Sequence, residues 1–270
     1  MSHFRTIELS DPAIPADGLR FVTVKSPALG RRADLCLWTP EDVAQGPLPL
    51  VVLLHGVYGS HWAWALKGGA HCMAARLIAE GALPPVVLAM PSDGLWGDGS
   101  GYLRHDGGDF ERWVMEDVPH AAAEATGLCD PHAQFLLAGL SMGGFAALRL
   151  AGRHPGRIAA AAGHSSATDA AGLAPLIEED IAGWGSGLSV LSALAGARQP
   201  LPPLYFDCGL DDPYLAGNRA LSAALNARGI PHLYREAAGG HGWDYWRREI
   251  ENSLRFFGNH LAARQEKTGG

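Results

Sequence analysis

The chain has no apolar run that approaches the roughly 20 residues needed to span a bilayer. Its first residues also lack the charged segment and apolar core that mark a secretory signal. From both absences we expect a cytoplasmic protein without a membrane partner.

Basic residues are scarce as well. Lys and Arg number 21 against 28 Asp and Glu, so the formal net charge is −7, and no basic cluster stands out. This balance disfavours nucleic acid as a partner and leaves a small molecule as the expected one. A length of 270 residues, 47% of them hydrophobic and 18% charged, is sufficient for one globular domain with a large core.

Cysteine is the third scarce residue type. The four cysteines, Cys36, Cys72, Cys129 and Cys208, are widely spaced and form no Cys-x-x-Cys motif. We expect buried free thiols, which suit a reducing compartment, and a disulfide between two of them is the less favoured alternative. No group of His, Cys, Asp or Glu has the spacing of a zinc site, so neither a metal nor another cofactor is expected.

Apolar runs alternate with helical patterns along most of the chain. Strands are predicted at residues 19–25, 31–38, 50–54, 85–90, 134–138, 158–162, 204–208 and 232–235. Helices are predicted at about 71–80, 109–125, 144 onward, 215–227 and 245–261, with weaker ones at 175–181 and 188–195. The alternation predicts an α/β fold, in which helices cover both faces of a mostly parallel sheet. One domain is expected over 1–270, with an N-terminal extension at 1–18, a short cap excursion at 165–199 and a loose tail at 262–270.

The strand at 134–138 leads directly into Gly139-Leu140-Ser141-Met142-Gly143. Between a strand and a helix, Gly-x-Ser-x-Gly is the nucleophile elbow, a strained turn that exposes the serine hydroxyl. Side chains at positions 139 and 143 would collide with the neighbouring strand or helix. Ser141 is therefore the predicted nucleophile, and a purely structural Ser/Gly turn is the alternative in a chain with 35 glycines.

A serine hydroxyl needs a base to become a nucleophile. His241 stands in a Gly-rich loop between the last strand and the final helix, where the third member of a Ser–Asp–His triad belongs. The other histidines after the serine are His154, His164, His232 and His260. We predict His241 as the base in preference to all of them.

The base in turn needs a carboxylate to orient it. The loop after the strand at 204–208 offers Asp211 and Asp212, and sheets of this kind build their sites from such loops. Either aspartate could reach His241 while the other caps the following helix. Spacing leaves both open, whereas Asp207 lies inside the strand and is less accessible.

Two backbone N–H groups are expected to stabilise the oxyanion of a tetrahedral intermediate. Met142 follows the serine at a helix N-terminus, so its N–H points toward that oxygen. Val57, in the Gly-rich turn after the strand at 50–54, supplies the second donor. His55, at the end of that strand, is expected to hold the loop through hydrogen bonds rather than to act as a base.

Together these residues resemble the esterase D/putative esterase branch of the α/β hydrolases, which includes S-formylglutathione hydrolases, feruloyl and acetylxylan esterases and mycolyltransferases. The resemblance covers about 50–257 and rests on Leu-Leu-His-Gly-Val-Tyr-Gly-Ser at 53–60, Met-Pro-Ser-Asp-Gly at 90–94, Gly-Leu-Ser-Met-Gly-Gly at 139–144, Cys-Gly-Leu-Asp-Asp at 208–212 and Gly-Gly-His-Gly-Trp at 239–243. It implies an α/β-hydrolase fold, Asp212 rather than Asp211 as the acid, and Val57 as the loop donor. His-Gly-Val-Tyr at 55–58 departs from the Ser-Gly-Leu-Thr-Cys of formylglutathione hydrolases, so the resemblance implies the family activity rather than a named substrate.

The resulting expectation is a serine carboxylesterase that hydrolyses a small ester or thioester through an acyl-enzyme on Ser141. An acyltransferase with an alcohol or sugar acceptor is the first alternative, because it uses the same acyl-enzyme. A non-catalytic binding protein on this fold is less favoured. Trp62 and Trp243 lie near the predicted active-site loops and are candidate substrate contacts, with packing into the core as an equal alternative.

Overall fold

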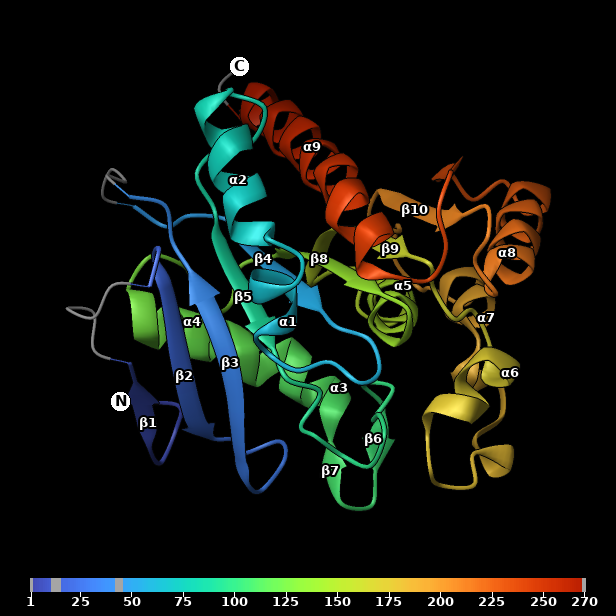
Figure 1. The fold of residues 1–270 in the computed structure, drawn as a ribbon, viewed down its shortest axis with the longest axis horizontal. Coiled ribbons are helices and arrows are strands. Elements are labelled where there is room, and N and C mark those ends of the chain that lie inside the picture. The colour runs from blue at the N-terminus through green and yellow to red at the C-terminus, as the bar shows by residue number, and fades with distance from the viewer. Residues whose placement is uncertain (1, 11–15, 42–45, 269–270) are drawn as a thin grey trace.

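The computed structural model describes residues 2–10, 16–41 and 46–268. Within this part of the chain, nine strands form one central sheet (Figure 1). In chain order they are β1 (Ile7–Leu9), β2 (Leu19–Lys25), β3 (Arg32–Trp38), β4 (Leu50–Leu54), β5 (Val87–Pro91), β8 (Phe135–Leu140), β9 (Ile158–His164), β10 (Leu204–Gly209) and β11 (Leu233–Ala237). Two short strands, β6 (Arg104–His105) and β7 (Gly108–Asp109), pair separately.

The order across the sheet is β1-β2-β3-β5-β4-β8-β9-β10-β11. The strands β1, β2 and β3 are antiparallel to their neighbours, and β3 meets β5 antiparallel. From β5 to β11 every neighbouring pair is parallel. The carboxyl ends of the parallel strands therefore share one edge of the sheet, where such sheets build their sites.

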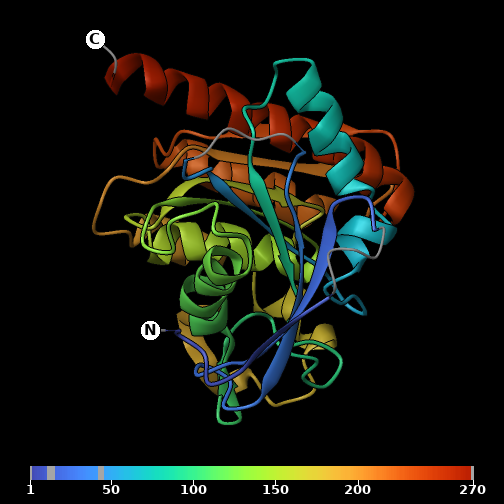
Figure 2. The ribbon, with the colours of Figure 1, turned by 90° about the vertical axis from the view of Figure 1, so that its left-hand side faces the viewer.

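Helical segments connect these strands. They are α1 (Ala63–Leu66), α2 (Ala70–Ala79), α3 (Phe110–Arg112), the π-helical turn η1 (Trp113–Asp117), α4 (Val118–Thr126), α5 (Met142–Arg153), α6 (Ala170–Leu173), the 3₁₀ turns η2 (Ala174–Leu176) and η3 (Ala182–Leu188), α7 (Val190–Ala195), α8 (Leu215–Ala227) and α9 (Trp243–Thr268). Figure 2 shows α2 and α9 on one side of the sheet and α4 and α5 on the other. No helix in the described part of the chain is both long and apolar enough to cross a membrane.

The sheet divides the hydrophobic core in two. On β4, Val51 and Leu53 pack with residues of α1, α2 and α9, whereas Val52 and Leu54 pack with residues of α4, α5, α7 and α8. Successive side chains of a strand point to opposite faces, so both faces of β4 are covered. This explains why the strand is a continuous apolar run, and the predicted α/β fold is confirmed.

Most predicted strands and helices agree closely with the structure, and the exceptions have physical causes. The helix predicted at 175–181 is wrong, because η2 ends at Leu176 and Ile177 takes an extended conformation (φ −122°, ψ 124°), so Ile177 and Ile181 are buried from an irregular segment rather than from a helix. The loose tail predicted at 262–270 is wrong over 262–268, where good helix formers extend α9 to Thr268. Residues 269–270 lie outside the described part.

Other predictions need smaller corrections. The helix predicted at 109–125 is present, but the π-helical turn η1 interrupts its α-helical geometry. The extension at 1–18 contributes β1, which had no separate prediction. Within the excursion at 165–199, α7 packs on α5 so closely that a Cβ on Gly152 would lie 2.4 Å from the Ala193 carbonyl carbon. The single-domain organisation stays a prediction.

The four thiols are free, but they are not all buried. Cys36 and Cys208 are buried in strands, and Cys129 is half-buried. Cys72 is exposed, which corrects its predicted burial. On α2, the side chains of Ala74 and Leu77 face the core, and Cys72 lies outside that buried stripe.

Candidate active site

Ser141 lies between the end of β8 and the start of α5 in a backbone conformation that few residues adopt. Its φ is 54° and its ψ is −116°, outside the regions that ordinary L-residues occupy. Its Oγ faces the loop that follows β11. This strand–turn–helix geometry is that of the predicted elbow.

Glycine is required on both sides of Ser141 because neighbouring backbone approaches closely. A Cβ on Gly139 would lie 2.2 Å from the Gly143 carbonyl oxygen. A Cβ on Gly143 would lie 2.4 Å from the Leu54 carbonyl oxygen, at the end of β4. Neither position admits a side chain, so the steric prediction for these two glycines is confirmed.

The structure brings His241 to Ser141 although 100 residues separate them in sequence. His241 Nε2 lies 3.0 Å from Ser141 Oγ. The histidine lies between β11 and α9, and its side chain is 26% exposed, so water can reach the imidazole. The Trp246 ring packs edge-on against it, with the ring centres 4.9 Å apart, and thereby restricts its orientation.

Asp212 lies on the other side of the imidazole. His241 Nδ1 donates to Asp212 Oδ2 at 2.9 Å, and the Tyr214 N–H donates to Oδ1 at 2.8 Å. Burial raises the pKa of Asp212, but the hydrogen bonds to the carboxylate outweigh burial and hold the pKa below its usual range. An ionised carboxylate can only accept, so the proton sits on Nδ1 and Nε2 is free to accept from the serine. Asp211, the alternative left open by spacing, is exposed.

Val57 and Met142 belong to the two segments that converge on Ser141. Met142 begins α5, so its N–H has no acceptor within the helix. Within the described part of the chain, no group accepts from the Val57 N–H. Gly56 lies against the serine, because a Cβ there would be 2.9 Å from Ser141 Cβ. Both N–H groups are thus free to bind a developing negative charge.

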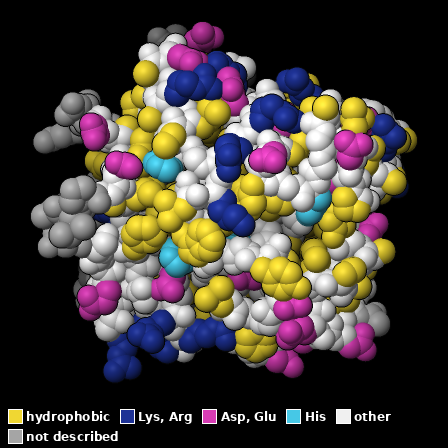
Figure 3. Space-filling view, in the orientation of Figure 1, with side chains coloured by type: hydrophobic (Ala, Val, Ile, Leu, Met, Phe, Trp, Pro, Cys, Tyr) yellow, Lys and Arg dark blue, Asp and Glu magenta, His cyan; other side chains and the backbone are white. Residues whose placement is uncertain are grey.

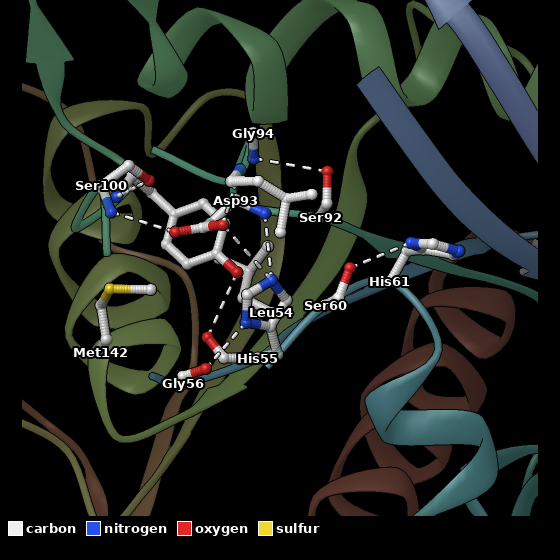
Figure 4. Close-up of polar contacts among 12 residues, drawn as sticks. Leu54, His55, Gly56, Ser60, His61, Ser92, Asp93, Gly94, Ser100 and Met142 are labelled. Atoms are coloured by element: carbon white, nitrogen blue, oxygen red, sulfur yellow. Dashed lines mark hydrogen bonds and ion pairs between the residues drawn. The ribbon is translucent and has the colours of Figure 1, made fainter. Parts of the chain in front are cut away.

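His55 is buried and holds the loop after β4, as the sequence predicts. Figure 4 shows its ring between Asp93 and the Gly56 carbonyl. Nδ1 donates to the Gly56 oxygen at 2.8 Å, and Nε2 accepts from the Asp93 N–H at 3.0 Å. Burial lowers the pKa of His55, although the Asp93 carboxylate opposes this effect. The neutral imidazole therefore links two loops.

Asp93 orders the second of these loops. Its Oδ1 accepts from the Leu95 N–H and its Oδ2 from the Ser100 N–H, both at 3.0 Å (Figure 4). A carboxylate that binds several backbone N–H groups makes a loop rigid. Through His55, this rigid loop supports the segment that carries Val57.

Three of the other histidines after Ser141 contact different groups. His154 Nε2 pairs with Glu111 at 2.7 Å, His232 Nε2 lies 2.9 Å from Ser222 Oγ, and His164 Nδ1 lies 2.9 Å from Asp207 Oδ2. Each of these three rings is thus bound to a group other than Ser141. His241 is the histidine that the structure places on Ser141.

A cavity of about 230 Å³ is lined by Leu140, which precedes the serine, by Gly56, which lies against it, and by both predicted tryptophans. Trp62 is 39% exposed, and Trp243 is partly buried. The sequence did not single out Trp246 or Lys67, which also line the cavity. No motif marks them, because they join this wall only through the packing of α1 against α9.

Comparisons with known proteins identify the family. The sequence matches the family described as "Putative esterase" over residues 26–257. The chain belongs to this family. It has the α/β-hydrolase fold and is an esterase, that is, a carboxylic ester hydrolase. The predicted resemblance is thereby confirmed.

Individual relatives agree with this assignment. An acetyl esterase of Caldicellulosiruptor saccharolyticus is 29% identical over 238 residues, which cover 79% of this esterase and 85% of the relative. FphF, a fluorophosphonate-binding serine hydrolase of Staphylococcus aureus, superposes with a TM-score of 0.75 at 20% identity, over 88% of this chain and 97% of that one. An S-formylglutathione hydrolase from Agrobacterium tumefaciens gives 0.73 at 19% identity, over 97% and 100%. At these identities the two solved structures show that the fold is shared.

Proposed function

We propose that Ser141, His241 and Asp212 are the catalytic triad of this esterase, with the N–H groups of Val57 and Met142 as its oxyanion hole. One observation carries the proposal: the His241 imidazole bridges Ser141 Oγ and Asp212 Oδ2, at 3.0 and 2.9 Å. Nucleophile, base and orienting acid thus have the mutual geometry that acyl transfer needs.

The reaction proceeds in two halves. In the first, His241 Nε2 takes the Ser141 proton as Oγ attacks the acyl carbon, and the imidazolium passes that proton to the leaving alcohol or thiol. In the second, His241 takes a proton from the water that attacks the acyl-enzyme, and returns it to Ser141 Oγ as the acyl–Oγ bond breaks and the carboxylic acid leaves. Each N–H at the oxyanion contributes about 3 kcal/mol to the transition state.

The substrate that we propose is a small ester or thioester. The cavity beside the serine, at about 230 Å³, is smaller than the roughly 300–1,000 Å³ of pockets for drug-sized ligands. The acetyl esterase relative also supports a short acyl group. Four unpaired thiols favour a reducing compartment such as the cytoplasm as the place of action.

The test measures where the acyl group goes. With p-nitrophenyl acetate, the wild type is expected to release acetate and p-nitrophenol, and a fluorophosphonate probe is expected to label Ser141, as located by peptide mass spectrometry. Ser141→Ala should keep the wild-type circular dichroism and lose both signals. Turnover by this variant at the wild-type rate would contradict the proposal.

A second measurement separates hydrolysis from transfer. Adding an acceptor alcohol such as glycerol diverts an acyltransferase to a new ester, whereas a hydrolase continues to release acetate. Because the His241 side chain is 26% exposed, water has access to the acyl-enzyme, and we expect free acetate to predominate. A majority of transferred acyl groups would favour the acyltransferase alternative.

A further inference from the structure

The cavity beside Ser141 has two chemically different walls. One wall is backbone-rich and includes Gly56, Val57 and Leu140. The other lining surface is aromatic and consists of Tyr58, Trp62, Trp243 and Trp246, here called the aromatic wall. Gly56 lies directly against Ser141. A substituent of the substrate that occupies this cavity is therefore bonded close to the scissile ester bond. The cavity is thus placed to select one part of the substrate.

A cation without an acidic partner stands at the rim. Lys67, just after α1, lines the cavity, and its Nζ lies 5.8 Å from the centre of the Trp243 ring. Among the described residues, no Asp or Glu oxygen lies within salt-bridge distance of this ammonium. By contrast, Arg76 and Arg255, where α2 meets α9, pair with glutamates.

A second cation, Arg247, contacts the backbone of Lys67. Arg247 Nε and Nη2 donate to the Lys67 carbonyl at 3.1 and 2.9 Å. The neighbouring acid in sequence, Asp244 in the first turn of α9, is exposed. Because Arg247 binds the Lys67 backbone, Lys67 is the cation that lines the cavity itself. Figure 3 shows apolar side chains gathered over α1, with basic side chains next to them.

The aromatic wall near Lys67 is fixed rather than adaptable. The Trp243 ring packs edge-on against Trp64 and Trp246, with ring centres 5.6 and 5.4 Å apart. A Cβ on Gly68 would lie 3.0 Å from Trp243 Cζ3, so the backbone after α1 also touches this ring. A flat apolar face with a cation above it suits a short hydrocarbon spacer that ends in an anion.

We propose that this cavity selects esters carrying a carboxylate a few bonds from the ester group, with Lys67 as the specificity-determining residue. The inference rests on the proposed function, because it assumes that Ser141 is the nucleophile. The carboxylate belongs either to the acyl part, as in a half-ester of a dicarboxylic acid, or to the alcohol part, as in an acylated hydroxy acid. The cavity volume limits the spacer to a few carbons.

The experiment compares charged and neutral substrates of the same shape. For the acyl part, monoethyl succinate is compared with ethyl levulinate, in which a methyl ketone replaces the carboxylate. For the alcohol part, 3-acetoxypropanoate is compared with 4-acetoxybutan-2-one. The ratio of kcat/KM values within each pair is measured by pH-stat for the wild type, Lys67→Met, Lys67→Glu and the control Lys25→Met. Lys25 is a suitable control because it does not line the cavity. It lies on β2, and its Nζ donates to the Gly30 carbonyl.

We expect the wild type to prefer the carboxylate in one of the pairs, and that pair identifies which part of the substrate fills the cavity. Lys67→Met should lower the preference about fivefold to tenfold, and Lys67→Glu should reverse it. Lys25→Met should keep the wild-type ratio. Higher ionic strength should reduce the preference, because salt screens an ion pair at an open rim.

The ratio within a pair cancels any general loss of activity in a variant. Hydrolysis of the neutral esters with the same ratio in the wild type and Lys67→Met would overturn this inference and leave the proposed function intact. If the wild type hydrolysed none of the four esters, nor ethyl acetate, both would be overturned.

Discussion

His164 Nδ1 lies 2.9 Å from Asp207 Oδ2, the same separation that joins His241 Nδ1 to Asp212 Oδ2. The resemblance extends to a serine, because Ser253 Oγ lies 2.9 Å from His164 Nε2. The described part of the chain thus contains a second Ser–His–Asp arrangement beside that of Ser141. The difference is solvent: Ser253, His164 and Asp207 are fully buried, whereas His241 is open to water. We assign the buried arrangement to holding β9, β10 and α9 together.

The two serines are therefore expected to respond in opposite ways to the same substitution. Ser141→Ala should lower kcat by at least about a thousandfold, because only binding and the oxyanion donors remain. Ser253→Ala should leave kcat within a few-fold and cost about 1–3 kcal/mol of unfolding free energy, because a buried histidine nitrogen loses its partner. Steady-state hydrolysis and urea unfolding measure these two effects. A folded Ser253→Ala variant without activity would contradict the assignment.

Adjacent aspartates provide the second prediction. Asp212→Asn should lower kcat by roughly 10⁴-fold, because an amide in place of the carboxylate no longer fixes the proton on His241 Nδ1. The neighbouring Asp211→Asn, at an exposed position, should change kcat less than about twofold. The measurement is kcat for p-nitrophenyl acetate in both variants at one pH. Equal losses would show that the loop, and not the carboxylate, matters.

The sequence predicted what local patterns encode. A continuous apolar run identified β4, and Gly-x-Ser-x-Gly after such a run identified the turn at Ser141. The motif is informative because backbone approaches so closely at Gly139 and Gly143 that this turn admits only glycine at both positions. The choice between Asp211 and Asp212 depended on the family resemblance, because spacing is nearly the same for both.

Features made by contacts between distant segments were not predictable. His164 and Asp207 are 43 residues apart and His164 and Ser253 are 89 residues apart, so no motif connects them. Lys67 follows a short helix in an undistinguished segment, and only the packing of α1 against α9 places it at the cavity. The end of α9 was missed because its last turns lack an apolar stripe, while the helical propensity of these residues is high.

His55 gives a prediction about positioning. His55→Leu removes the partner of the Gly56 carbonyl and of the Asp93 N–H, so the loop that carries Val57 should loosen. We expect kcat to fall about tenfold to a hundredfold with a smaller change in KM, and His55→Gln to restore part of the loss. His61→Gln, in the same loop, is the control. An unchanged kcat in His55→Leu would exclude this role.

The same histidine predicts acid sensitivity of the loop. Burial lowers the pKa of His55 in the folded state relative to about 6.5 in an unfolded chain. A lowered histidine pKa means that its contribution to stability is complete above about pH 6.5 and is lost as pH falls through the folded value. Wild-type unfolding free energy should therefore decline on acidification below pH 6.5, and less so in His55→Leu. Parallel declines would contradict it.

Glu111 carries the last prediction, which concerns stability at a distance from the active site. Its carboxylate accepts from Arg149 Nη1 at 2.8 Å, Arg153 Nε at 2.9 Å and His154 Nε2 at 2.7 Å. Arg149 is almost completely buried. Burial raises the pKa of Glu111, but its three basic partners outweigh burial and lower the pKa to about 2. Glu111 therefore fastens α3 to the C-terminal end of α5.

A lowered carboxylate pKa stabilises the folded state above the unfolded pKa, near 4.5, and the gain is lost as pH falls toward 2. The shift corresponds to about 3 kcal/mol. Glu111→Gln should cost about this much at pH 7, because buried Arg149 loses its counter-ion, and should flatten the decline between pH 5 and pH 2. The exposed pair of Glu116 with Arg112 makes Glu116→Gln the matched control, with a cost below about 1 kcal/mol. Urea unfolding from pH 7 to pH 2 distinguishes the two, and an equal cost in both variants would contradict the role of Glu111.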